Sequence, residues 1–118
     1  GTVFACDARL VALAQEAAGD LEGVRVVTGR VASGDLFVAD PAAGARIRET
    51  FGAACAEMEG AACAQVCAFW RVPFVVVRSI SDTADHSAHV DFRSFTGLAA
   101  ARAETLVRGI LRRLAARG

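Results

Sequence analysis

The chain has 118 residues, which suits one domain of ordinary size, and 54% of them are hydrophobic. This apolar content can fill a core, so a disordered chain is excluded. Thirteen basic and thirteen acidic residues cancel to a formal net charge of zero without forming blocks. We therefore expect no nucleic-acid partner and no membrane surface.

The first third of the chain alternates between helix and strand patterns. Asp7 is a helix cap in front of a periodic apolar stretch, which predicts a helix over residues 8–18. The β-branched stretch Val24–Val31 predicts a strand, and Ser33–Asp35 supplies the turn signal at its end.

The middle of the chain repeats this alternation. Asp40 followed by Pro41 combines an N-cap with a proline at the first helical position and predicts a second helix, which Gly52 stops. A short apolar run at 53–56 predicts the next strand, and a third helix is expected near Ala61–Trp70.

The last third contains the strongest strand pattern. Six of the eight residues of Pro73–Ile80 are apolar, which is typical of a strand covered on both faces. Asp91 then caps a long last helix. Its expected buried stripe consists of Phe95, Leu98, Ala99, Leu106, Ile110 and Leu114.

Strands alternating with helices indicate an α/β fold, with a mostly parallel sheet between two helical layers (a three-layer αβα arrangement). We expect residues 1–118 to form part of a single domain. The chain opens on a helix, and three strands make a thin sheet. An N-terminal half that supplies further strands is therefore expected to be absent from this chain.

No apolar run reaches the eighteen or so residues needed to cross a bilayer, and no leader pattern is visible, so we expect a cytoplasmic protein. The four cysteines, Cys6, Cys55, Cys63 and Cys67, are expected to be small buried thiols. Two of them are four residues apart in a helical pattern, a geometry that does not suit a disulfide or a zinc knuckle.

Polar residues follow each predicted strand at 33–38, 57–60 and 78–82. In open parallel sheets, ligands bind beyond the carboxyl ends of the strands, so these three places are expected to form one site. Arg78 interrupts an otherwise apolar strand and needs a partner. It either pairs with Asp82 or Glu59 to hold the sheet edge, or lies near an anionic or hydroxyl-bearing ligand.

Glu57, Met58 and Glu59 place two carboxylates close together in one short segment. One carboxylate can face a pocket while the other braces the scaffold. Ionised carboxylates bind vicinal sugar hydroxyls well, but acidic residues also stabilise a helix N-terminus. Both interpretations stay open for this pair.

Two further features flank these places. The stretch 82–89 holds two Asp and two His, but it reads as a solvated loop, so no metal site is expected. Phe37 follows a strand end, and Phe92 begins the last helix. Each is either a core aromatic or a ligand-stacking ring.

With these residues in view, the chain resembles the nucleoside phosphorylase superfamily, and within it the 5′-methylthioadenosine/S-adenosylhomocysteine nucleosidases. The resemblance runs from about Phe4 to the end. It rests on three ordered motifs, SGDLF at 33–37, AEMEGA at 56–61 and VPFVVVRSISD at 72–82. The segments SDTAD at 81–85 and DFRSF at 91–95 favour the nucleosidase branch.

The resemblance implies the C-terminal portion of that fold and roles on the purine side of a nucleoside. Phe37 stacks on adenine, and the backbone of Val38 bonds its Watson–Crick edge. Ser81 and Asp82 face the N7 side, with Asp82 as the general acid. A positioned acid is worth about 10²–10⁴-fold in rate. Asp82 would need a pKa well above the ordinary value of about 3.9 to keep its proton near pH 7.

On the ribose side, the resemblance implies that Met58 and Glu59 hold the sugar and that Arg78 lies near the ribose and the attacking water. Phe92 lines the pocket for the 5′ substituent. No cofactor is implied. The family is typically homodimeric, and its N-terminal half supplies the carboxylate that activates water, for which this sequence has no counterpart.

Three alternatives to this nucleosidase interpretation stay open. A purine nucleoside phosphorylase would use phosphate in place of water, and an aminofutalosine-type nucleosidase would differ in the 5′ substituent. The chain could also be a non-catalytic nucleoside-binding module whose chemistry is lost with the other half.

Overall fold

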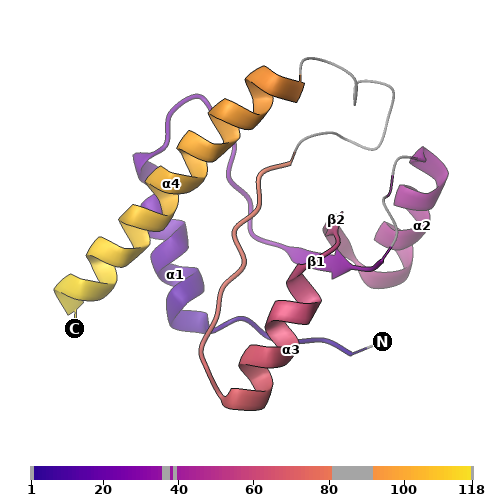
Figure 1. Ribbon diagram of the computed structural model, residues 1–118, viewed down its shortest axis with the longest axis horizontal. Helices are drawn as coiled ribbons and strands as arrows, with labels where there is room; N and C mark the ends of the chain where they lie inside the picture. The colour runs from indigo at the N-terminus through magenta and orange to yellow at the C-terminus, as the bar shows by residue number, and fades with distance from the viewer. Residues whose placement is uncertain (1, 36–37, 39, 81–91, 118) are drawn as a thin grey trace.

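The structure, a computed structural model, describes residues 2–35, 38, 40–80 and 92–117, and for residues 92–95 it describes the backbone alone. Among the described residues, helices and strands alternate as far as the third long helix (Figure 1), and the two strands are parallel, which confirms the predicted α/β class with a parallel sheet. The elements are α1 (Ala8–Ala17), the 3₁₀ turn η1 (Ala18–Asp20), β1 (Arg30–Ser33), α2 (Pro41–Phe51), β2 (Ala53–Glu57), α3 (Gly60–Trp70) and α4 (Phe92–Arg117).

The helices begin and end where local chemistry requires it. The Asp7 carboxylate accepts a hydrogen bond from the Leu10 amide at 2.9 Å and caps α1. Asp40 caps α2 with Pro41 at its first position, as the sequence predicts. Gly52 ends α2 in the left-handed conformation at φ 63°, which glycine adopts at little cost.

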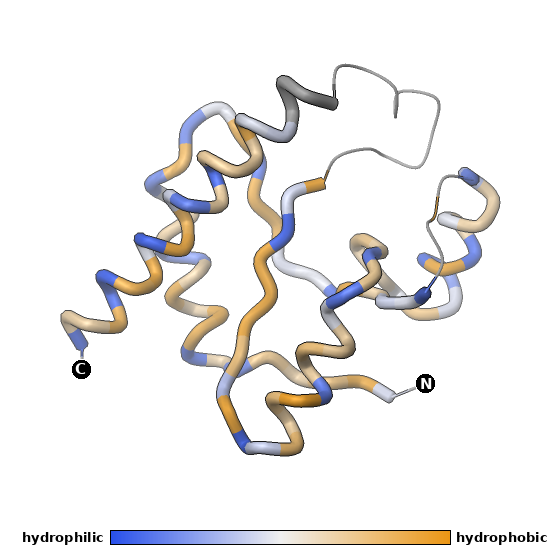
Figure 2. Tube along the Cα trace, viewed as in Figure 1, coloured by the Kyte–Doolittle hydropathy of each residue, from blue (hydrophilic) through white to orange (hydrophobic). Residues whose placement is uncertain are grey.

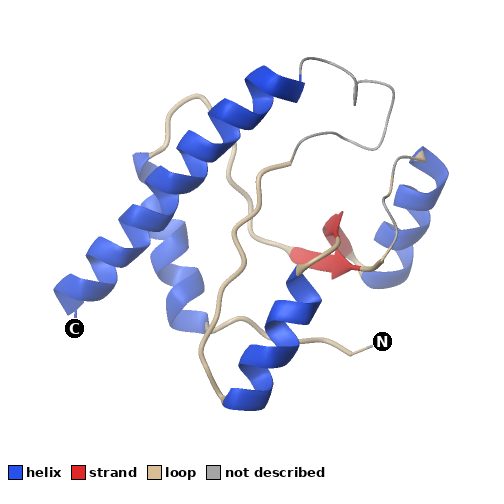
Figure 3. Cartoon of the chain, viewed as in Figure 1, coloured by secondary structure: helices blue, strands red, loops and turns tan. Residues whose placement is uncertain are grey.

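The two strands form a parallel pair (Figure 3). Ser33, the last residue of β1, lies opposite Glu57, the last residue of β2. Because the strands run in the same direction, both carboxyl ends meet at one edge. This register brings two of the three expected polar places together.

The first predicted strand is wrong in extent. The sequence predicts a strand over Val24–Val31, whereas β1 begins only at Arg30. Val26 and Val27 are 45% and 62% exposed. A strand needs a neighbouring ladder, and within the described residues β2 offers one only from Arg30 onward.

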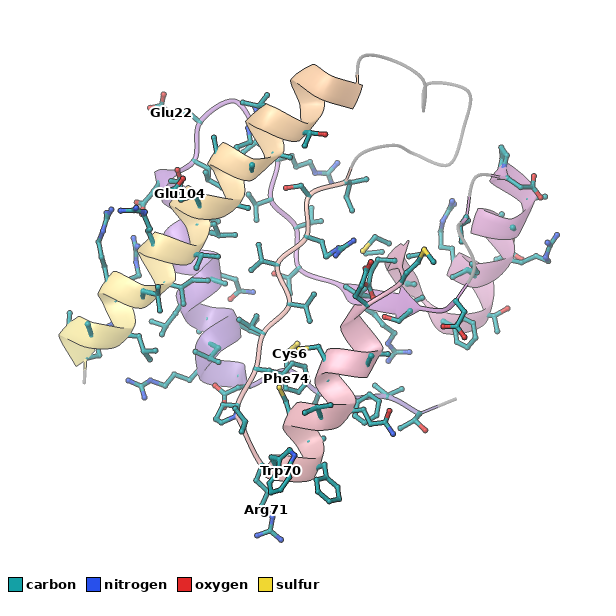
Figure 4. All side chains as sticks on the ribbon, in the orientation of Figure 1. Cys6, Glu22, Trp70, Arg71, Phe74 and Glu104 are labelled. Carbon is teal, nitrogen blue, oxygen red and sulfur yellow. The ribbon has the colours of Figure 1, made fainter. Side chains whose placement is uncertain are left out.

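The third predicted strand, Pro73–Ile80, is not part of the sheet. This segment crosses the molecule as an extended apolar chain (Figure 2), and residues 74–77 are half-buried. Within the described residues, one backbone hydrogen bond joins it to a distant segment, from the Asp7 amide to the Phe74 carbonyl at 2.8 Å. Figure 4 shows Phe74 beside Cys6 at this contact. Apolar patterning alone does not make a strand when neighbouring backbone is lacking.

The core lies between α1 and α4, which pack side by side (Figure 1). Leu13 and Ala17 of α1 meet Leu106 and Ile110 of α4, and Val77 of the extended segment packs against this cluster. Beyond the core, Arg113 pairs with Asp20 at 3.0 Å and Arg117 with Glu16 at 2.9 Å. None of the described helices is both long and apolar enough to span a membrane.

Two details of the predicted packing are corrected. Leu98, expected in the buried stripe of α4, is 50% exposed, since α1 is too short to cover the N-terminal part of that helix. The four cysteines are free thiols but are not fully buried, and Cys63 is exposed. The side chain of Cys63 lies on a part of α3 that no described element covers.

Two glycines of α4 test the helix contact. A Cβ at Gly109 would lie 2.9 Å from the Cβ of Ala17, whereas at Gly97 no described atom lies within 4 Å. Gly97→Ala should stabilise the protein by up to about 1 kcal/mol through helix propensity. Gly109→Ala should instead destabilise it by about 1–3 kcal/mol through overpacking. Urea unfolding measures both free energies, and equal changes would contradict the close approach of α1 and α4.

Candidate active site

The candidate site lies at the shared carboxyl edge of β1 and β2, where α3 begins. Ser33 and Glu57 end the two strands, and Glu59 precedes the first residue of α3. Arg78 reaches the same edge from the extended segment, with its guanidinium within 4 Å of both carboxylates. Three segments far apart in sequence therefore meet there.

Glu57 is the buried member of this cluster, with a side chain only 3% exposed. Its carboxylate accepts hydrogen bonds from the Glu59 amide at 2.8 Å and from the Gly60 amide at 2.8 and 2.9 Å. The Ser33 hydroxyl donates a further bond to it. These donors include first-turn amides of α3, which have no partner within the helix. The carboxylate therefore sits where the helix dipole favours negative charge.

The pKa of Glu57 reflects a balance between these forces. Burial raises the pKa, but the Ser33 hydroxyl, the Glu59 and Gly60 amides and the Arg78 charge together outweigh it. The net result is a pKa below the ordinary value of 4.5. Glu57 is therefore ionised at neutral pH and holds its place as an anion.

Glu59 differs from Glu57 in its exposure and in its hydrogen bonds. Its side chain is 73% exposed, and it makes no capping hydrogen bond to α3. Arg78 lies 3.5 Å from Glu59 and 3.8 Å from Glu57, and its own side chain is 41% exposed. Such exposed pairs contribute at most about 1 kcal/mol to stability. The Glu59–Arg78 pair thus remains accessible to a ligand.

The structure shows which contacts Glu57, Glu59 and Arg78 make, and these contacts bear on the interpretations that the sequence left open. Glu57 occupies the N-terminus of α3, as the helix interpretation expects, and Arg78 pairs with Glu59, as the ion-pair interpretation expects. The same contacts leave one carboxylate exposed and one bracing the scaffold. A structural contact and a binding role are compatible for Arg78 and Glu59, because both groups still reach solvent.

Other predicted site residues are placed less completely. Met58 is 45% exposed beside Glu59, and Val38 is half-buried. Phe37, Ser81 and Asp82 lie outside the described residues, as does the 82–89 stretch with its Asp and His residues. Phe92 begins α4, but its side chain is also outside the description. Their expected roles stay predictions.

Two residues of this site carry no role in the sequence-based expectation. The Ser33 hydroxyl joins Glu57 and also accepts a hydrogen bond from the Ala61 amide at 2.9 Å. Gly60 leaves room for the carboxylate, since a Cβ there would lie 2.6 Å from Glu57 Oε1. A polar residue at the end of one strand, in register with a carboxylate on the next, is the signal that could have identified Ser33.

The chain belongs to the phosphorylase superfamily, whose sequence profile matches residues 2–112. It is 39% identical over 112 residues to the 5′-methylthioadenosine/S-adenosylhomocysteine nucleosidase of Bacillus subtilis. That match covers 94% of this chain and 48% of the relative. The chain thus spans about half the length of the curated relatives it matches.

Solved structures show the same fold. The 5′-methylthioadenosine/S-adenosylhomocysteine nucleosidase of Neisseria meningitidis, in complex with methylthio-immucillin-A, superposes with a TM-score of 0.81 at 40% identity. It matches over 93% of this chain and 48% of its own. Futalosine hydrolase of Helicobacter pylori gives a TM-score of 0.81 at 34% identity, over 93% and 47% of the two chains. The chain therefore matches about half of each of these folds.

The buried carboxylate generates a pH-dependent prediction. Because the folded pKa of Glu57 is lowered, its contribution to stability is present above pH 4.5 and is lost as the pH falls through the folded pKa. Glu57→Gln should cost about 1.5–3 kcal/mol at pH 7, the worth of charged hydrogen bonds. The difference from the unsubstituted protein should shrink below about pH 4.5.

Glu59→Gln provides the matched control, since it removes the same charge from an exposed side chain. We expect it to change the unfolding free energy by less than about 1 kcal/mol. Chemical denaturation between pH 3 and 7 measures both variants. A loss of stability in Glu57→Gln that does not vary with pH would contradict the ionised, helix-bound carboxylate.

Proposed function

We propose that this chain serves in hydrolysis of the N-glycosidic bond of 5′-methylthioadenosine or S-adenosylhomocysteine, releasing adenine. The observation that supports this most is the exposed Glu59–Arg78 pair at the carboxyl edge of two parallel strands. It occurs in a chain 39% identical to a nucleosidase of that name. Ligands of parallel α/β folds bind at this edge.

In the proposed reaction, Glu59 binds the ribose hydroxyls. An ionised carboxylate accepts short, strong hydrogen bonds from two neighbouring hydroxyls, and Glu59 is exposed enough to do so. Arg78 keeps the carboxylate oriented and lies near the sugar and the attacking water, while Met58 packs beside the ribose. Glu57 does not contact the ribose; its carboxylate bonds the Glu59 amide and so fixes the segment that carries Met58 and Glu59.

Asp82 supplies the proton in the proposed reaction. Breaking the glycosidic bond builds positive charge on the ribose and negative charge on the departing purine, so protonation at N7 assists departure. Asp82 follows Arg78 by four residues, which keeps it close in the chain to the ribose-binding pair. Ser81 assists on the N7 side. Phe37 stacks on the adenine, the Val38 backbone bonds its edge, and Phe92 lines the 5′ pocket.

We further propose that the working protein contains a second segment that completes the sheet and that it is a homodimer, as the resemblance implies. We also propose a cytoplasmic location. The chain matches only about half of its relatives. Within the described residues, the apolar segment 73–80 lies outside the sheet. Val66, Phe69 and Trp70 on α3 are 60%, 77% and 70% exposed. Apolar exposure of this kind indicates surfaces that further protein covers.

A second candidate substrate is an aminofutalosine-type nucleoside, which the 34% identity to Helicobacter pylori futalosine hydrolase supports. The glycosidic chemistry would be the same, and only the group at the 5′ position would differ. Assays with both nucleosides side by side separate the two substrates.

The completeness proposal predicts the behaviour of the chain alone. The 118 residues should show little or no release of adenine from 5′-methylthioadenosine, because no residue here matches the family's water-activating carboxylate. Adding the complementary segment of a relative should restore turnover. Liquid chromatography of the products measures both. Full activity of the isolated chain would contradict the need for a second segment.

The general-acid proposal predicts a selective loss of rate. In the completed protein, Asp82→Asn should lower kcat by about 10²–10⁴-fold, since the purine then leaves without its proton. Asp85→Asn, three residues further along the same stretch, is the control and should leave kcat within about twofold. Equal effects of the two substitutions would rule out a special role for Asp82.

A further inference from the structure

The hydroxyl of Ser33 connects three elements at once. As the last residue of β1, Ser33 donates to the Glu57 carboxylate at the end of β2. The same oxygen accepts a hydrogen bond from the Ala61 amide, in the first turn of α3, at 2.9 Å. A hydroxyl can play both parts because it carries one donor and acceptor lone pairs. The main chain repeats the connection, as the Gly34 amide bonds the Glu57 carbonyl at 3.1 Å.

Because of this arrangement, the Glu59 side chain does not cap α3. Glu59 stands at the N-cap position of α3, where a side chain ordinarily bonds the first-turn amides. Here Glu57 accepts from the Glu59 and Gly60 amides, and Ser33 accepts from the Ala61 amide. The amides of Glu59, Gly60 and Ala61 are thus satisfied by other residues, and the Glu59 carboxylate is left exposed beside Arg78.

The position of Arg78 depends on the same connection. Arg78 lies between two carboxylates, 3.8 Å from Glu57 and 3.5 Å from Glu59. The charge of Glu57 is already compensated by one hydroxyl and two amides, so the guanidinium stays available to the exposed partner. Without the Ser33 hydroxyl, a buried carboxylate would lose one donor and attract Arg78 more strongly. Arg78 would then move away from Glu59.

We propose that Ser33 is a positioning residue for ribose recognition. Its hydroxyl fixes Glu57 and the first turn of α3, and this holds the Glu59 and Arg78 side chains in the positions that ribose binding needs. This inference rests on the proposed function, because it takes the ribose as the ligand of Glu59. Gly60 belongs to the same device, since a Cβ there would displace the carboxylate that Ser33 holds.

Two nearly isosteric substitutions isolate the hydroxyl. Ser33→Thr keeps the donor and acceptor, whereas Ser33→Val has a similar shape and lacks both. Calorimetry on the 118-residue chain compares the affinity for adenine, which has no sugar, with that for 5′-methylthioadenosine. We expect Ser33→Val to weaken 5′-methylthioadenosine binding at least about tenfold. Adenine binding should change less than twofold, and Ser33→Thr should restore the ratio.

Two results would overturn the proposal. Ser33→Val could weaken adenine and 5′-methylthioadenosine equally, which would indicate a general loss of structure. It could also leave both affinities as they were, which would mean that the hydroxyl does not act on the ribose side.

If neither Ser33 variant folds, Gly60→Ala takes their place. Gly34→Ala is its control, because no described atom lies within 4 Å of a Cβ added at Gly34.

A second readout separates this proposal from the proposed function. Amide hydrogen exchange in the unliganded chain reports on Glu59, Gly60 and Ala61, whose amides bond Glu57 and Ser33. Protection in the unsubstituted chain that is lost in Ser33→Val supports the positioning role, even if the chain binds no nucleoside and the proposed function fails. Equal exchange in both chains overturns the positioning role, whatever the nucleoside binding shows.

Discussion

The site depends on one interaction, the Glu57 carboxylate seated at the N-terminus of α3. It joins the ends of two parallel strands to the first turn of a helix, and its side chain is almost fully buried. A buried charge is tolerated only when it is well compensated. Here the Ser33 hydroxyl, the Glu59 and Gly60 amides at the start of α3 and the Arg78 guanidinium provide that compensation, and they leave the pKa of Glu57 below its ordinary value.

As a consequence, Glu57 and Glu59 have different surroundings although they are only two residues apart. Glu57 uses its hydrogen bonds within the scaffold, while Glu59 makes no capping bond and is exposed, as the proposed binding of a ribose by Glu59 requires. Glu57 is the last residue of β2, whereas Glu59 lies beyond the strand at the N-cap of α3, where the backbone has left the extended conformation, so the two side chains have different surroundings. Arg78 lies within 4 Å of both carboxylates and so connects the exposed one to the buried one. Rigid support of this kind would keep the proposed binding pair, Glu59 and Arg78, preorganised.

The ends of the helices could be predicted from the residues at those ends, whereas the pairing of distant segments could not be predicted from the sequence. Asp7, Asp40 and Gly52 mark helix ends through their own backbone and side-chain chemistry, and the structure places the ends there. The strand predicted at Pro73–Ile80 was wrong, because a strand depends on neighbouring backbone that its own sequence cannot reveal. Glu59 and Arg78 were predicted from polar residues that follow apolar runs. Ser33 was placed at the expected ligand edge but was given no role, because its partner lies 24 residues away and the register that joins them appears only in three dimensions.

A crystal structure of the completed protein with a bound, non-hydrolysable analogue of 5′-methylthioadenosine tests the central claim most directly. The account predicts Glu59 oxygens about 2.5–3.0 Å from the two ribose hydroxyls, with Asp82 at a similar distance from the purine N7 position. Glu57 should remain bound to the α3 amides. Glu59 and Asp82 directed toward separate surfaces, with the analogue in contact with neither, would contradict the account.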